Sequence, residues 1–268
     1  RIAAEAGEVD AQLALARLYR TGAAGEPDPA LAERWTAAAA ERLEAQASAG
    51  DPKAQQRLGE LLLAGEGISR DAGRGLGWLD AAARGGRLSA QLALARLYER
   101  GADWLAANPA RAADYYRMAA DQGHGGARYA LAGMYAAGRG VAADGPRAIA
   151  LFKESAAAGE TRAYGALGDL YAAGEAVPQD AAAALSWYQE AARHGDGKAL
   201  FKIGEAYERG RGVAADPVQA LSWYTLAEEQ GYERASERVA RLGAALDPAA
   251  TQAAAQQADL WRRDHGAR

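Results

Sequence analysis

A motif that recurs about every 36 residues constrains the fold of this chain more than any other feature. The motif reads A-x-x-x-L-G/A-x-x-Y followed by a glycine, and successive copies start 43, 36, 37, 36, 36 and 36 residues apart. A second glycine lies four residues before every start. Because the motif and this glycine recur with the same spacing, we predict an array of similar units rather than one globular domain with a single core. The starts are Ala11, Ala54, Ala90, Ala127, Ala163, Ala199 and, in weaker form, Ala235.

Each unit predicts two helices. In the unit that starts at Ala199, small and apolar residues at positions one, five, six, eight and nine form the stripe of an amphipathic helix, here called helix A. Gly210 ends it, because glycine readily adopts the left-handed cap conformation. A second helix, helix B, then begins after an Asp or Asn, which are favoured N-cap residues. These caps are Asp28, Asp71, Asn108, Asp144, Asp180 and Asp216.

Neither helix of a unit can bury its apolar face alone, so neighbouring units have to stack. We therefore predict an all-α solenoid of antiparallel helix pairs. Residues 1–234 are expected to hold six repeats, with starts near 11, 54, 90, 127, 163 and 199, preceded by the end of an earlier repeat. Residues 235–268 are expected to form a degenerate half-repeat and a C-terminal capping helix.

The combined pattern of A-x-x-x-L-G-x-x-Y, a loop similar to G-x-G-V-x-x-D, and A-L-x-W-Y-x-x-A-A resembles the Sel1-like repeat, a relative of the tetratricopeptide repeat. The resemblance covers about residues 3 to 235. It implies a right-handed superhelix whose concave groove, lined by helix A, binds protein partners. It also implies a bacterial source.

Composition and charge exclude several classes of function. The chain has 31 Lys and Arg against 35 Asp and Glu, a net charge of −4, so it lacks the cationic surplus of a nucleic-acid binder. No apolar run approaches the ~18 residues of a membrane-spanning helix. The chain has no cysteine, which removes disulfides, thiolate nucleophiles and cysteine-ligated zinc.

The sequence also predicts no catalytic site, no metal site and no cofactor. The three histidines, His124, His194 and His265, form no H-x-x-x-H motif, and the first two flank inter-repeat glycines where exposed turns are expected. The Asp that recurs once per repeat is interpreted as a helix cap rather than as part of a carboxylate site.

By analogy with tetratricopeptide arrays, positions three, seven and ten of helix A are predicted to face the groove rather than the stack. The candidate partner-binding residues are Arg17, Leu92, Arg96, Tyr129, Asp169, Phe201 and Glu205. In the C-terminal half, Asp169 and Glu205 lie beside aromatic residues, which favours a cationic peptide with an apolar anchor. The competing interpretation is that Tyr129 and Phe201 only broaden the packing between helices.

Two departures from the repeat have two interpretations each. Seven extra residues around Glu41–Ala47 are close to two helical turns, so they can lengthen helix B without changing its phase. This extension is either a protruding functional feature or a tolerated insertion. Trp104 replaces the usual loop sequence, and it either anchors a partner or folds back as a local plug.

We therefore expect a non-enzymatic interaction scaffold of a bacterial assembly. The family resemblance implies envelope proteins that assist exopolysaccharide export or assembly, or alternatively regulators of signalling or host contact. A third reading, a β-lactamase-like enzyme, is disfavoured because such relatives depend on disulfides that this chain cannot form. The chain opens inside a helix B without an initiating Met, so we expect it to be cut from a longer chain that could carry an N-terminal anchor. The periplasm or cell envelope is favoured over the cytoplasm.

Overall fold

The computed structural model describes residues 2–23 and 25–265, and the regular elements within these ranges are helices. The only bridge of β type in the described residues is an isolated one between Ala102 and Leu105. The predicted fold class, an all-α solenoid of antiparallel helix pairs, is confirmed. The chain divides into two compact units, Arg1–Gln122 and Gly123–Arg268.

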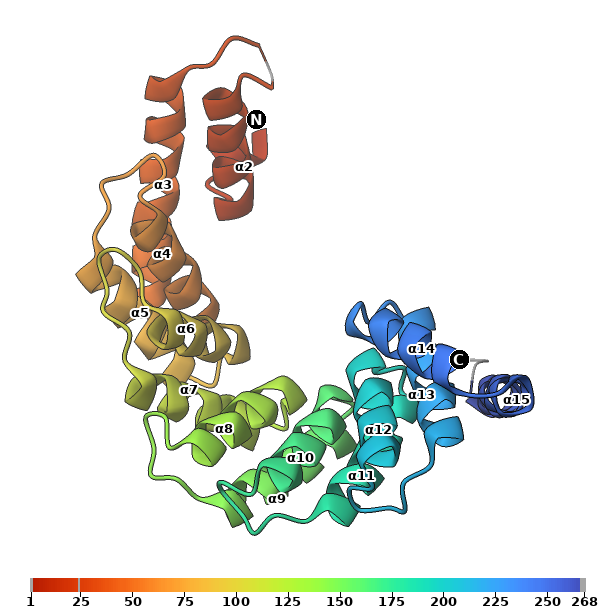
Figure 1. The fold of residues 1–268 in the computed structure, drawn as a ribbon. Helices are drawn as coiled ribbons and strands as arrows, with labels where there is room; N and C mark the ends of the chain where they lie inside the picture. Colours follow the sequence, from red (N-terminus) through yellow and green to blue (C-terminus); the bar gives the residue numbers. More distant parts are fainter. Residues whose placement is uncertain (1, 24, 266–268) are drawn as a thin grey trace. The chain divides into compact units, whose positions relative to one another are not determined.

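The first unit consists of one short helix followed by three helix pairs. The pairs are α2 with α3, α4 with α5, and α6 with α7. In each pair the first is the predicted helix A and the second the predicted helix B (Figure 1). The bounds are α1 Ile2–Glu5, α2 Val9–Thr21, α3 Pro29–Ser48, α4 Pro52–Ala64, α5 Ala72–Arg84, α6 Leu88–Arg100 and α7 Pro109–Asp121.

The second unit consists of three further pairs and two closing helices. Helices α8, α10 and α12 follow one side of this stack, and α9, α11 and α13 follow the other (Figure 1). The bounds are α8 Gly125–Ala137, α9 Gly145–Ala157, α10 Arg162–Ala173, α11 Ala181–Arg193, α12 Gly197–Arg209, α13 Pro217–Glu229, α14 Arg234–Ala245 and α15 Pro248–His265.

The core of each unit is built from the residues that recur in the motif. The first position of helix A is a buried alanine from the second repeat onward, and the fifth position is a buried Leu or Ile. Because the alanine at the first position is small, the two helices of a pair and the next pair approach closely. The buried residues at the fifth position are Leu58, Leu94, Leu131, Leu167 and Ile203.

The predicted helix caps are confirmed. Each Asp or Asn before helix B accepts a hydrogen bond from a backbone N–H in the first turn, for example from Arg74 N to Asp71 at 2.9 Å. The glycines that precede each repeat all have positive φ, for example 93° at Gly50, so they form the turn between repeats. The recurring Asp is therefore accounted for by capping.

The seven-residue extension of the first repeat lengthens helix B, as predicted. Helix α3 has 20 residues, whereas α5, α7, α9, α11 and α13 have 13. Its added turns carry the buried Leu43 and Ala47, which pack with Leu58 and Leu62 of α4. The extension therefore contributes to the core of unit 1, while a partner-binding role for it stays a prediction.

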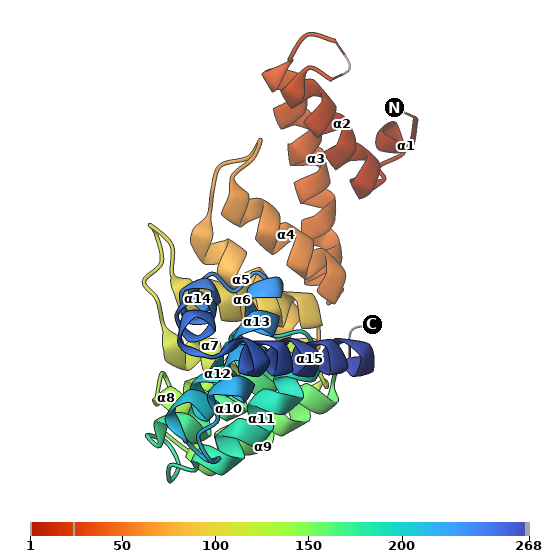
Figure 2. The same cartoon turned by 45° about the vertical axis from the view of Figure 1, so that its right-hand side comes forward.

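The last two helices close the second unit. Helix α14 contacts α13, as a further helix A would, but α15 also lies against α13 (Figure 2). The rings of Trp261 on α15 and Trp223 on α13 meet edge to face, with centroids 4.7 Å apart. Gln252 and Gln256 on α15 are exposed, as expected for the outer side of a cap. The end of the stack is therefore covered by a helix with a polar outer side.

Alanine substitutions at two glycines would show how closely neighbouring repeats pack. A Cβ at Gly145 would lie 1.9 Å from the carbonyl oxygen of Ala176, in the loop of the next repeat. We therefore expect Gly145→Ala to lower the free energy of unfolding by about 1 to 3 kcal/mol, as overpacking does. Gly133 lies within α8 with no atom near its missing Cβ, so Gly133→Ala should instead stabilise by about 0.5 to 1 kcal/mol.

Urea denaturation followed by circular dichroism measures both variants against the parent chain. Equal shifts of the midpoint for Gly145→Ala and Gly133→Ala would contradict close packing between the repeat loop and helix α9.

Candidate partner-binding surface

In unit 1, the predicted groove residues lie on helices α2 and α6. Arg17 and Arg96 are exposed, and Leu92 is partly buried. The two arginines are therefore accessible to a partner, whereas Leu92 presents only part of its side chain. Their participation in binding stays a prediction.

In unit 2, Tyr129 on α8 is partly buried between two neighbours. Its ring meets the edge of Phe152 at a centroid distance of 5.5 Å, and the guanidinium of Arg162 lies 4.9 Å from its centroid. Tyr129 therefore contributes both to packing within its repeat and to a cation–π contact with the next repeat.

The prediction that Phe201 lines the groove is wrong. Its side chain is only 1% exposed, and its ring lies 5.1 Å from the rings of both Tyr224 and Tyr232. Arg234 covers it further, with its guanidinium carbon 5.5 Å from the ring centroid. Phe201 belongs to the core because helix B of its own repeat and the turn that follows supply aromatic residues on two sides, so the competing interpretation as packing is correct for this residue.

Asp169 and Glu205 both lie on helices A of unit 2, and the carboxylate of each already pairs with a cationic side chain of the protein. Asp169 pairs with Lys198 at 2.7 Å and accepts a hydrogen bond from the Tyr188 hydroxyl at 2.8 Å. The hydrogen bond to Asp169 raises the pKa of Lys198, which keeps the Lys198 ammonium charged at neutral pH.

Glu205 pairs with Lys202 at 2.8 Å and lies 3.6 Å from Arg209. The basis for a preference for cationic peptides is therefore removed, because cations of the chain itself neutralise both Asp169 and Glu205.

A cationic residue at one register position links consecutive helices A in unit 2. Arg162, Lys198 and Arg234 are spaced by 36 residues, and each side chain reaches back to the preceding helix A. The residues they contact are Tyr129, Asp169 and Phe201, respectively. This row of contacts ties the helix A surface of one repeat to that of the next.

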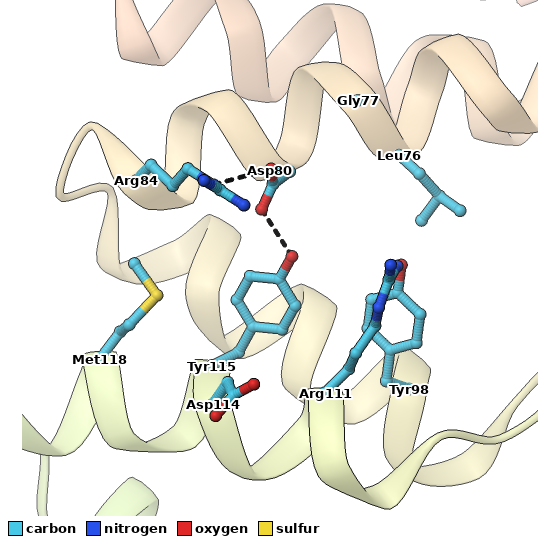
Figure 3. A pocket seen from close by; sticks show the side chains of 9 residues that line it. All are labelled: Leu76, Gly77, Asp80, Arg84, Tyr98, Arg111, Asp114, Tyr115 and Met118. Carbon is cyan, nitrogen blue, oxygen red and sulfur yellow. Dashed lines mark hydrogen bonds and ion pairs between the residues drawn. The ribbon is translucent and has the colours of Figure 1, made fainter.

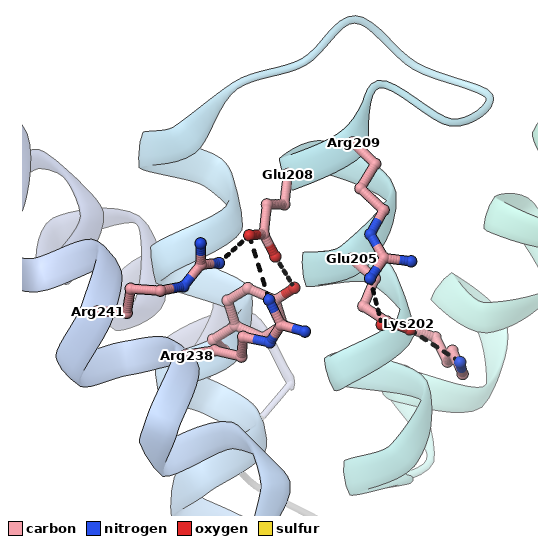
Figure 4. Close-up of polar contacts among 7 residues, drawn as sticks. Lys202, Glu205, Glu208, Arg209, Arg238 and Arg241 are labelled. Carbon is pink, nitrogen blue, oxygen red and sulfur yellow. Dashed lines mark hydrogen bonds and ion pairs between the residues drawn. The ribbon is translucent and has the colours of Figure 1, made fainter. Parts of the chain in front are cut away.

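Glu208 on α12 is the centre of a polar cluster in unit 2 (Figure 4). Its carboxylate accepts a hydrogen bond from the Tyr224 hydroxyl at 2.6 Å, lies 3.4 Å from Arg238, and pairs with Arg241. Burial alone raises the pKa of this carboxyl. The hydrogen bonds from Tyr224 and Arg241 and the nearby arginine charges outweigh that effect, so the pKa of Glu208 is lowered.

The same arrangement recurs in two other repeats. In each, the hydroxyl of a helix B tyrosine donates a hydrogen bond to a carboxylate on helix A. Tyr116 donates to Glu99 at 2.7 Å, and Tyr188 donates to Asp169 at 2.8 Å. Burial raises the pKa of both tyrosines, so they stay protonated and act as donors. The hydrogen bond fixes helix A against helix B within the repeat.

Trp104 lies in the loop after α6 and is partly buried. Its ring packs against the guanidinium of Arg70, whose central carbon lies 4.5 Å from the ring centroid. Because Arg70 belongs to the loop of the preceding repeat, one face of Trp104 is used within the protein. This supports the local-plug interpretation, while partner binding through the rest of the ring stays a prediction.

A pocket of about 530 Å³ lies in unit 1 between α5 and α7 (Figure 3). Leu76 and Met118 form apolar walls, and Tyr115 donates its hydroxyl to Asp80 at 2.6 Å. Burial raises the pKa of Tyr115, and the hydrogen bond to Asp80 adds to this effect. The phenol therefore stays protonated at neutral pH and acts as a hydrogen-bond donor to Asp80.

The histidines have structural surroundings in the described part of the chain. His124 accepts a hydrogen bond from Ala127 N at 3.0 Å and caps α8, so it is partly buried rather than fully exposed as expected. His194 is exposed and stacks on Tyr164. Among residues 2–23 and 25–265, no three His, Asp or Glu side chains are grouped as metal ligands would be.

Sequence reasoning missed Glu208, Arg238 and Arg241. Glu208 could have been found, because position ten was predicted to face the groove and Glu208 occupies the same repeat position as Glu99, but residues were named only at positions three and seven. Arg238 and Arg241 lie in the degenerate last repeat, for which no groove residue was predicted, although Arg234 continues the 36-residue spacing of Arg162 and Lys198 into it.

Comparison with known proteins identifies the family. The Sel1 repeat model matches six segments, at residues 9–42, 52–86, 88–124, 126–160, 161–196 and 197–232. The chain belongs to the Sel1 repeat family. Members of this family are generally non-enzymatic repeat scaffolds that bind protein partners.

Two solved structures of Sel1 type are similar over nearly the whole chain. A Sel1 repeat protein from Oxalobacter formigenes shares 32% identity, with a TM-score of 0.67, over 97% of this chain and 78% of that one. The protein c5321, a protective antigen of uropathogenic Escherichia coli with an SLR fold, shares 28% identity, with a TM-score of 0.63. That match covers 98% of this chain and 55% of the E. coli chain, so the present chain spans about half of its length.

A comparison with curated protein sequences found no match. Among the described residues, none of the helices combines the length and apolar character needed to cross a bilayer.

The lowered pKa of Glu208 predicts how the stability of this Sel1 chain depends on pH. At neutral pH, Glu208→Gln should lower the free energy of unfolding by about 1 to 3 kcal/mol, because it weakens charge-assisted hydrogen bonds. The folded-state pKa lies below the ordinary value of 4.5. The carboxylate's contribution is therefore complete above that value and is lost as the pH falls through the folded-state pKa.

Thermal unfolding between about pH 6 and pH 3 measures this difference, which should shrink as the solution becomes acidic. Glu237→Gln, at an exposed position on the neighbouring α14, is the control and should change little. A difference between Glu208→Gln and the parent chain that stays constant over this range would refute the assignment.

Proposed function

We propose that this Sel1 repeat chain is a non-enzymatic scaffold of a bacterial assembly that binds protein partners on its helix A surface. The observation that carries the proposal is the organisation of this surface in unit 2. Its polar side chains are held by contacts between consecutive repeats, as in Lys198 with Asp169 and Arg162 with Tyr129. Such prior ordering reduces the conformational entropy lost when a partner binds.

The two sides of the repeat differ in what they offer a partner. The aromatic residues of helix B in the last repeats, such as Tyr188 and Tyr224, are buried between helices. Helix A instead carries an alternation of cations and carboxylates at partly exposed positions. Polar groups with fixed positions provide specificity in protein recognition, which supports helix A as the binding side.

A role in the cell envelope, in exopolysaccharide export or assembly, rests on the family resemblance. A role in host contact has one specific observation in its favour, since the E. coli protein that this chain resembles is described as a protective antigen. Both roles use the chain in the same way, as a surface on which another protein is positioned.

Site-specific photo-crosslinking tests the binding side. A photoreactive amino acid replaces Arg96 on α6 or Ala166 on α10, and in a matched control it replaces Ala150, which is exposed on α9. In the cells that make the protein, we expect covalent adducts with a partner protein from the helix A positions and not from Ala150. Mass spectrometry identifies the adducts.

Adducts from Ala150 alone would place the interaction on the helix B side. If no position gave an adduct, the chain would be a structural spacer rather than a scaffold that recruits proteins.

A further inference from the structure

Six charged residues of α12 and α14 form a surface cluster with more cations than carboxylates (Figure 4). We call it the charge patch, and its members are Lys202, Glu205, Glu208, Arg209, Arg238 and Arg241. Each carboxylate is shared by two cations. Lys202 and Arg209 flank Glu205, and Arg238 and Arg241 flank Glu208. Four positive charges against two negative charges leave a surplus of two.

Exposure increases the effect of this surplus. The side chains of Glu205 and Glu208 are both 15% exposed, whereas those of the four cations are 27% to 52% exposed. The carboxylates therefore lie beneath, and the guanidinium and ammonium groups meet the solvent. A molecule that approaches the patch encounters donors and positive charge first.

The neighbouring helix α10 carries no such surplus. Its Asp169 pairs with Lys198, and the neighbouring Arg162 pairs with Glu160 through two hydrogen bonds of 2.7 and 2.9 Å. On α14, the exposed Arg234 and Glu237 cancel one another in charge. The surplus of the patch therefore comes from its own four cations, two on α12 and two on α14.

The buried hydroxyl of Tyr224 keeps the patch in place. It donates to Glu208 from the core side, so the carboxylate cannot turn outward to meet a ligand. Glu208 in turn orients Arg238 and Arg241. Guanidinium groups that are already ordered lose less entropy when they bind a second carboxylate.

We propose that the charge patch docks an acidic segment of the partner protein, with partner carboxylates bound by Arg209 and Arg241. This rests on the proposed scaffold function and adds the chemistry of the partner. Arginine favours planar carboxylates because it donates two parallel hydrogen bonds. Nucleic acid fits less well, because the chain carries a net charge of −4 and the surplus spans only two helices.

The test removes one cation from each triad and leaves the other. In the double variant Arg209→Gln with Arg241→Gln, Glu205 keeps Lys202 and Glu208 keeps Arg238, so no carboxylate is left without a cation. The control Arg193→Gln with Arg262→Gln removes the same charge from α11 and α15, at pocket-lining positions away from the patch. Circular dichroism and thermal unfolding confirm that both variants are folded.

The probe is a fluorescent peptide with six glutamates, compared with peptides carrying six glutamines or six lysines and with a single-stranded oligonucleotide. Fluorescence anisotropy at low and physiological salt measures binding. We expect the glutamate peptide to bind best and to weaken with salt. Its Kd should rise about tenfold in the Arg209/Arg241 variant and less than about twofold in the control.

Equal loss in both double variants would show an effect of net charge and overturn the proposal. Stronger binding of the lysine peptide, or comparable binding of the oligonucleotide, would overturn it as well. If crosslinks from the helix A positions identify a partner while the glutamate peptide does not bind, the scaffold function stands and only the acidic chemistry fails.

Discussion

Close packing of small residues between repeats is the constraint on which the rest of the structure depends. Alanine at the first position of helix A, and glycine or alanine at the sixth, bring the backbone of each helix near its neighbour, and larger apolar residues fill the remaining space. Because each repeat contacts mainly its neighbours, the fold repeats one interface along each unit. The recurring turns and caps then keep the units in register, since they place every helix start at an equivalent point.

Because the repeats are in register, charged side chains at equivalent positions form an ordered row on the surface. Residues 36 positions apart, such as Arg162 and Lys198, lie on equivalent points of neighbouring helices, and each reaches the preceding repeat. Hydrogen bonds from helix B tyrosines to helix A carboxylates hold the anionic members in place from below. The cations are then left nearer to solvent. Through this arrangement, the repeats determine both the stability of the stack and the sign of the surface that a partner meets.

Periodicity predicted the fold because packing residues recur and caps have a local cause. The Asp before helix B needs only its own first turn to act, so its role could be inferred from the sequence. The binding surface was harder to predict, because the exposure of a groove position depends on how the surrounding side chains are placed in three dimensions. Phe201 is covered by Tyr224 of helix B and by Tyr232 in the turn that follows. The partners of Glu205 lie on its own helix, so their spacing was visible in the sequence, whereas the Lys198 partner of Asp169 comes from the next repeat. Spacing identifies which helix a side chain belongs to, but packing between helices decides the exposure of Phe201, and pairing between repeats decides the charge balance at Asp169.

We propose that ordered cations on helix A recognise a partner's carboxylates. A crystal structure of the protein with a glutamate-rich peptide would test this, because it locates the bound segment. We expect peptide carboxylates within hydrogen-bonding distance of the Arg209 and Arg241 guanidinium groups, with Glu205 and Glu208 still held by Lys202 and Arg238. A peptide seated on the helix B side, or in the pocket between α5 and α7, would contradict it.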